Sequence, residues 1–275
     1  MTIENIFSLK DKVTVITGAA GLLGKKHAEA VCAFGGTPFL LDIKEDELHL
    51  LSEKLKNKYS TDVHSLGVDI TSESEVEMAS NEVIKICSKI DGLINNAANN
   101  PIPSTNNKDF SRLENFELDH WNKDISVGLT GAFLCSKHFG SKISKNPNGG
   151  VIINISSDLG LIAPDQRLYA VGEKDFHEQP VKPVTYSVVK TAMIGLTRYL
   201  STYWSDYGVR CNALCPGGVE NGQDPEFIEK VIKKIPMNRL ADASEYQGVI
   251  VWMLSDASSY LNGAILPVDG GRTAW

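Results

Sequence analysis

The feature that most constrains the fold is a repeated alternation of apolar, strand-like runs with helical patterns. The runs are Lys12 to Thr17, Thr37 to Asp42, Val63 to Asp69, Gly92 to Asn95, Val151 to Ser156, Val209 to Leu214 and Ala264 to Val268. Alternating strands and helices form parallel sheets, because each helix returns the chain across one face of the sheet. The sequence therefore predicts a doubly wound α/β fold with a seven-stranded parallel sheet and helices on both faces.

The length and charge of the chain narrow its classes of function. Its 275 residues fit one α/β domain over residues 1–275, with a sizeable core. A net charge of -7 and the lack of a basic run argue against nucleic acid and membrane surfaces as partners. The five cysteines lack paired spacing, which indicates reduced thiols and no metal site. Without a signal pattern or a run of membrane-spanning length, a cytoplasmic protein is expected.

The segment Val13 to Gly24 reads as a strand, a glycine turn and the start of a helix. Gly18 and Gly21 let the backbone approach a ligand closely, and the new helix directs N–H groups at a phosphate. Asp42 ends the next strand, about where a dinucleotide fold places an acid for the ribose hydroxyls. A Rossmann-type nucleotide site is predicted here, and a plain connecting turn is the alternative.

Three side chains form a candidate catalytic group. Tyr186 and Lys190 are four residues apart on a predicted helix, so the phenol and the ammonium share one face. A nearby cation favours the phenolate and lowers the pKa of a tyrosine, which allows Tyr186 to exchange a proton with an alcohol or carbonyl oxygen. Ser157 follows the run Val151 to Ser156, at a strand end where it can hydrogen-bond the reacting oxygen.

In order and spacing, these motifs resemble the short-chain dehydrogenase/reductase family over nearly the whole chain. The matching pieces are Thr17-Gly18, Asp42, Asp69-Ile70, Asn95 to Ala98, Ser157, Tyr186 with Lys190, Pro216-Gly217 and Val268 to Gly271. The resemblance implies that Ser157 orients the substrate oxygen and that Tyr186 is the acid/base. It implies that Lys190 lowers the pKa of Tyr186 and holds the nicotinamide ribose.

The same resemblance implies a set of cofactor-binding residues at the strand ends. They are Gly18, Gly21, Leu22, Leu23, Asp42, Ile43, Asp69, Ile70, Asn96, Ala97, Ala98, Tyr186, Lys190, Pro216, Gly217 and Val219. Asp42 can accept hydrogen bonds from a ribose diol and would repel a 2′-phosphate, so NAD is favoured over NADP. Lys25 and Lys44 are the residues that could favour NADP instead.

The chain departs from the family pattern at several positions. Leu22 stands where the family usually has a glycine in the turn, and Gly128 stands where it has a catalytic asparagine. The serine and the tyrosine are separated by an insertion at about 163–183, which is either a polar lid over the substrate or an ordinary solvated loop. Tyr169 lies nearer the usual distance from Ser157, and we set it aside because Glu173, not a lysine, follows four residues later.

Three functions are compatible with these motifs. The first is an NAD-dependent oxidoreductase that interconverts a secondary alcohol and a ketone on a sugar or another polar small molecule. The others are an NADP-dependent 3-oxoacyl thioester reductase and a nucleotide-binding regulator without catalysis. The surroundings of Ala163 to Asp165 and Pro183 to Tyr186 also resemble family members for flagellin and surface-glycan modification. The resemblance further implies a homotetramer or homodimer formed through Asn115 to Ser144, Tyr186 to Tyr203 and the last strand.

Overall fold

The computed structural model describes residues 3–99 and 111–275. Its centre is a sheet of β1 (Val13–Thr17), β2 (Thr37–Asp42), β3 (His64–Gly67), β4 (Gly92–Asn95), β5 (Gly150–Ile155), β6 (Val209–Pro216) and β7 (Ile265–Val268). The strands lie in the order β3-β2-β1-β4-β5-β6-β7, and every neighbouring pair is parallel. The predicted doubly wound fold is confirmed.

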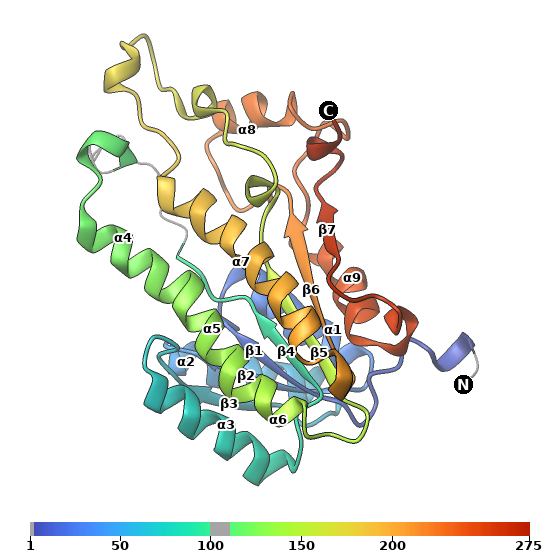
Figure 1. Ribbon diagram of the computed structural model, residues 1–275. Coiled ribbons are helices and arrows are strands. Elements are labelled where there is room, and N and C mark those ends of the chain that lie inside the picture. The colour runs from blue at the N-terminus through green and yellow to red at the C-terminus, as the bar shows by residue number, and fades with distance from the viewer. Residues whose placement is uncertain (1–2, 100–110) are drawn as a thin grey trace.

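Helices cover both faces of this sheet (Figure 1). One face carries α1 (Leu22–Ala33), α2 (Glu45–Tyr59) and α9 (Gln247–Leu254), and the other carries α3 (Glu73–Cys87) and α7 (Val184–Tyr203). Neighbouring strand residues point to opposite faces: Ile16 packs in the first core cluster and Val15 in the second. Both faces are buried, which explains why the strands are continuous apolar runs.

A long helix crosses the second face beside α7 (Figure 1). It consists of α4 (Leu118–Ile125), α5 (Gly131–Cys135) and α6 (Ser141–Ile143), joined by π-helical turns over Ser126–Thr130 and Ser136–Gly140. The sequence placed its start at Asn115. That residue instead ends a separate 3₁₀ turn, Leu113–Asn115. The remaining helix, α8 (Pro225–Ile232), lies near the carboxyl ends of the strands.

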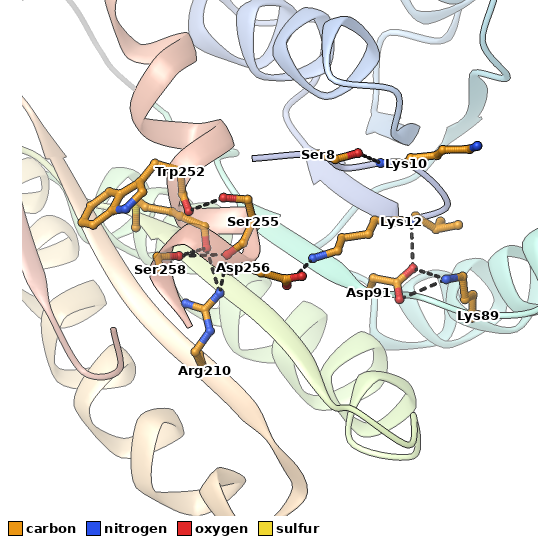
Figure 2. Close-up of polar contacts among 12 residues, drawn as sticks. Ser8, Lys10, Lys12, Lys89, Asp91, Arg210, Trp252, Ser255, Asp256 and Ser258 are labelled. Carbon is orange, nitrogen blue, oxygen red and sulfur yellow. Dashed lines mark hydrogen bonds and ion pairs between the residues drawn. The ribbon is translucent and has the colours of Figure 1, made fainter. Parts of the chain in front are cut away.

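The amino ends of the strands are held together by charged and backbone groups (Figure 2). Lys12 Nζ lies 2.8 Å from Asp256 Oδ1, and Asp91 Oδ2 accepts a hydrogen bond from the Val13 N–H at 2.8 Å. The Arg210 guanidinium donates to backbone carbonyl oxygens at the end of α9. These contacts join β1, β4 and β6 at the edge opposite the strands' carboxyl ends.

Two features are absent from the residues that the structure describes. Within 3–99 and 111–275, no helix is both long and apolar enough to cross a membrane. Over the same ranges, no group of histidine, cysteine and acidic side chains is arranged to hold a metal ion. All five cysteines lie in this part of the chain as free thiols.

Candidate active site

A cavity of about 1230 Å³ lies at the carboxyl ends of the strands, where ligands bind in open parallel sheets. It runs from the β1–α1 turn and the end of β2 to α7 and α8. Every residue that the sequence nominated for catalysis or cofactor binding lines this one cavity. Segments that are distant in the sequence therefore form one site, as expected from the parallel order of the strands.

The glycine turn can pack closely on itself and on the end of β4 only because side chains are missing. Gly18 has a φ of +61°, and a Cβ there would lie 2.7 Å from the Cα of Ala97. A Cβ on Gly24 would lie 2.2 Å from the Gly18 carbonyl oxygen. Gly21 is the N-cap of α1 and has no side chain that could accept a hydrogen bond from the helix. The N–H groups of the first helical turn therefore face the edge of the cavity. This cradle fits the pyrophosphate of a dinucleotide.

Asn96 and Thr17 fix the turn to the end of β4. The amide of Asn96 donates to the carbonyl oxygens of Thr17 and Gly18, both at 3.0 Å. Thr17 Oγ1 accepts from the backbone N–H groups of Asn96 and Ala97, at 3.0 and 3.1 Å. These two side chains therefore hold the turn in place, and Asn96 also lines the cavity.

Asp42 lies in the cavity wall at the end of β2. Its carboxylate accepts hydrogen bonds from the N–H of Ala20 at 3.0 Å and of Lys44 at 3.2 Å, one on each oxygen. Lone pairs on both oxygens remain for a ribose diol. The two lysines that could favour a 2′-phosphate both pair with Glu47, Lys44 at 2.8 Å and Lys25 at 3.2 Å.

Ser157, Tyr186 and Lys190 meet at the other end of the cavity. Tyr186 and Lys190 are on adjacent turns of α7, and Lys190 Nζ lies 5.9 Å from the centre of the Tyr186 ring. Lys190 is buried and donates to the Ile155 carbonyl oxygen at 2.9 Å. Ser157 is the second residue after β5 and is also buried, so all three side chains are held within or close to regular structure.

The direction of the Tyr186 pKa differs from the sequence expectation. Burial raises the pKa of Tyr186, while a hydrogen bond with Ser157 and the charge of Arg272 partly oppose it. Burial also lowers the pKa of Lys190 to about 8, with help from the charge of Lys182. Desolvation of the phenolate therefore outweighs the lowering that was expected from Lys190.

The sequence motifs did not identify several charged residues of the cavity wall, among them Asp158, Lys182 and Arg272. Lys182 Nζ lies 3.9 Å from the centre of the Tyr186 ring, closer than Lys190 does. Burial lowers the pKa of Lys182 to about 8. Nothing in the motifs identified these positions, because each depends on how a loop folds back over the strand ends.

The insertion contributes one wall of the cavity, and its character differs from the expected polar lid. Its lining residues are Leu168, Tyr169, Ala170, Val171, Pro180 and Lys182. The other charged side chains of the insertion, Arg167 and those between 173 and 178, are exposed. Arg112 ties the tip to the start of α4, donating to the Phe176 carbonyl oxygen at 2.8 Å. The exposed part is therefore a solvated loop, and the part that lines the cavity is mostly apolar.

Tyr169 lies in the same wall and packs on Phe227, with ring centres 5.6 Å apart. Burial raises its pKa to about 12, and the nearby Tyr186 and Asp158 add to that effect. The argument against Tyr169 from the position of Glu173 is wrong, because it assumed a helix that contains both residues. The 3₁₀ turn Gln166–Tyr169 ends at this residue, so Glu173 is not on a shared helical face.

Gly128 has a packing role. A Cβ at this position would lie 2.5 Å from Val189 Cγ1 on α7. A second cavity, of about 10 Å³, lies beside it and is lined by Asn99, Asp124, Gly128, Thr185, Tyr186, Val189 and Lys190. Asp124 accepts hydrogen bonds there from Asn99 at 3.2 Å and Thr185 at 2.5 Å. An asparagine side chain at 128 would collide with α7 unless Val189 moved.

We predict a pH-dependent stability from His27, which is fully buried in α1 behind the glycine turn. Burial lowers its pKa from 6.5 to about 3, an effect that Asn96 partly opposes. Between these values the unfolded chain binds the proton and the folded chain does not, so stability falls as the pH drops below 6.5. From pH 7 to pH 5 the loss from this group is about 2 kcal/mol.

Urea unfolding of His27→Leu at both pH values tests this prediction. The variant should lose about 2 kcal/mol less than the parent on acidification, whatever its stability at pH 7. His49→Leu, which removes an exposed imidazole, is the control and should follow the parent. Equal losses in His27→Leu and the parent would contradict the prediction.

The chain is similar in sequence to several known oxidoreductases and to a flagellin modification protein. A family model described as "Enoyl-(Acyl carrier protein) reductase" matches residues 18–273. The chain is 30% identical to the post-translational flagellin modification protein A of Campylobacter coli, over 96% of this chain and 98% of that one. It is 31% identical to an NADP-dependent mannitol dehydrogenase of Hypocrea jecorina, covering 98% and 95%. It is 30% identical to an NAD-dependent glycerol dehydrogenase of Listeria innocua, covering 97% and 96%.

Proposed function

Because the chain belongs to the short-chain dehydrogenase/reductase family and is an oxidoreductase of alcohol and ketone groups, we propose that its cofactor is NAD and its substrate a sugar-derived or other polyhydroxylated molecule. The observation that carries the proposal is the shared cavity. It has the carboxylate of Asp42 at one end and the side chains of Ser157, Tyr186 and Lys190 at the other.

In this proposal, Tyr186 exchanges the proton of the reacting oxygen. The phenol donates a proton to a ketone oxygen or, as phenolate, accepts one from an alcohol. Ser157 contacts the same oxygen and fixes its place beside Tyr186. Lys190 keeps a positive charge next to the phenol, which favours the phenolate as the proton leaves. A bound nicotinamide supplies or accepts the hydride.

Two observations support NAD over NADP. A 2′-phosphate beside the ionised Asp42 would be repelled. Lys25 and Lys44 are both engaged by Glu47, so neither is an uncompensated charge for that phosphate. The names of the relatives include both an NAD-dependent and an NADP-dependent enzyme. The preference therefore rests on Asp42 and its surroundings.

The wall of the cavity near Tyr186 supports a polar substrate. Its polar side chains are Asp158, Tyr169, Lys182, Asn221 and Arg272. Groups of this kind can hydrogen-bond the hydroxyls of a polyhydroxylated substrate. Two relatives carry polyol names, and a third is named for flagellin modification. The last likeness supports the narrower proposal of a role in surface-glycan modification, in the cytoplasm.

A ligand and substrate screen tests this proposal. Thermal unfolding is followed with NAD, NADP, nucleotide sugars, sugar phosphates and polyols, since a ligand that binds the folded state raises Tm. Turnover is then measured by absorbance of the reduced nicotinamide. We expect NAD to stabilise more than NADP and a polyhydroxylated compound to be oxidised. Turnover of a 3-oxoacyl thioester with NADPH, and of no polyhydroxylated compound, would establish the alternative reductase. Binding without any turnover would favour the regulator.

We also propose that the protein is a homotetramer or homodimer. Phe133 on α5 is 50% exposed, and Tyr199 and Tyr203 on α7 are 61% and 58% exposed. Exposed aromatic groups on neighbouring long helices are typical of an interface. Sedimentation at micromolar concentration should give a dimer or tetramer, and Tyr203→Glu should shift it towards monomers. A monomeric parent protein would overturn the proposal.

A further inference from the structure

The carboxyl-terminal segment brings a charged side chain into the candidate active site. After β7, Gly270 and Gly271 have φ angles of +67° and +90°, which turn the chain back. Asp269 fixes this turn by accepting from the backbone N–H groups of Gly271 at 2.9 Å and Thr273 at 2.8 Å. Arg272 is thereby held next to the loop that follows β5, with 8% of its surface exposed.

Arg272 forms a buried ion pair with Asp158. Arg272 Nη1 lies 3.0 Å from Asp158 Oδ2, and the two side chains are 9% and 4% exposed. Removing two charges from water is costly, and a buried ion pair is often no more stabilising than apolar side chains of similar volume. Stability alone therefore does not explain why these two charges are placed here.

Asp158 in turn holds Ser157. Its other oxygen, Oδ1, accepts from Ser157 Oγ at 2.8 Å and from the Leu159 N–H at 2.8 Å. An ionised carboxylate only accepts, so the hydroxyl hydrogen of Ser157 points to Asp158. Ser157 Oγ itself accepts from the Leu159 N–H at 3.2 Å, which leaves one lone pair for the O–H of Tyr186 or of an alcohol substrate.

We propose that Asp158 and Arg272 are positioning residues for the reaction, acting through Ser157. Arg272 fixes the carboxylate of Asp158 through the ion pair, and Asp158 holds the Ser157 hydroxyl in one orientation. The carboxyl-terminal turn is thus part of the catalytic apparatus, although it follows the last strand. The inference rests on the proposed function, because it requires Ser157 to contact the reacting oxygen.

Three variants separate positioning from stability. Arg272→Met leaves a buried carboxylate without its cation, and should lower Tm by roughly 5–10 °C. The double variant D158L/R272M replaces the pair with apolar groups and should regain most of that Tm. Its kcat should nevertheless be lower by roughly 10²-fold, because Ser157 has lost its acceptor. D158N/R272M keeps an amide oxygen for Ser157 and should recover much of kcat.

Several outcomes decide the inference. Parent-like kcat in a stable D158L/R272M would show that the pair is only structural, and equal loss in both double variants would exclude orientation by the acceptor. Ser157→Ala is measured alongside these variants. If Ser157→Ala keeps the kcat of the parent, Ser157 has no part in the reaction, and it is the proposed function that fails. NADH binding, followed by fluorescence, should be unchanged in all variants. The control is K12M/D256L, which removes an ion pair at the opposite edge of the sheet and should keep kcat.

Discussion

Replacing Tyr186 with phenylalanine is expected to lower kcat by roughly 10²- to 10⁴-fold on any substrate that the parent protein turns over. The change removes the hydroxyl that exchanges the proton and keeps the ring, which packs beneath Lys182. Because the ring stays in place, the folded structure and NADH binding should be preserved. Steady-state kinetics with thermal unfolding and NADH fluorescence measure all three properties.

Tyr169→Phe is the matched control for this prediction. Tyr169 lines the same cavity and also has a raised pKa, but it lies in the insertion and no lysine shares its turn. Its loss should raise KM, with kcat reduced by less than about 10-fold, as expected for a substrate contact. The opposite ranking of the two variants would transfer the acid/base role to Tyr169 and remove the basis for the proposed mechanism.

The parts of the site that were predictable share one property: they lie within regular elements or directly at their ends. Gly18 follows β1, Asp42 ends β2, and Lys190 follows Tyr186 by one helical turn. In a parallel sheet all strands end at the same edge, so local motifs can be assembled without knowledge of the loops. This is why the nominated residues all line a single cavity.

What the sequence did not reveal depends on loop paths. Arg272 reaches Asp158 only because two glycines with positive φ turn the terminal segment back. Lys182 reaches Tyr186 because the returning part of the insertion passes over α7, where Gln166 accepts from the Lys182 N–H at 2.8 Å. No periodic pattern encodes such paths, since each is fixed by a few specific contacts.

The pKa of Tyr186 shows a second limit. From the spacing alone, Lys190 should lower it, and that argument counts only the charge. Burial of the side chain raises it instead. The degree of desolvation is a property of the assembled cavity, so the sequence could identify the pair of groups without the direction of the shift.

Asp42→Asn is expected to change the preference between the two cofactors by roughly 10²- to 10³-fold in favour of NADP. The substitution removes the charge that would face a 2′-phosphate, and its amide oxygen still accepts one of the hydrogen bonds from Ala20 and Lys44. Fluorescence titration of NADH and NADPH gives both Kd values without a known substrate. Asp42→Asn should bind NADPH more tightly than the parent does. It should bind NADH less tightly, because the ribose diol loses a charged acceptor.

Asp46→Asn, an exposed change in the first turn of α2, should leave both Kd values as they are in the parent. If the ratio of the two Kd values is the same in Asp42→Asn and the parent, Asp42 does not set cofactor choice, and the proposal of NAD loses its main support.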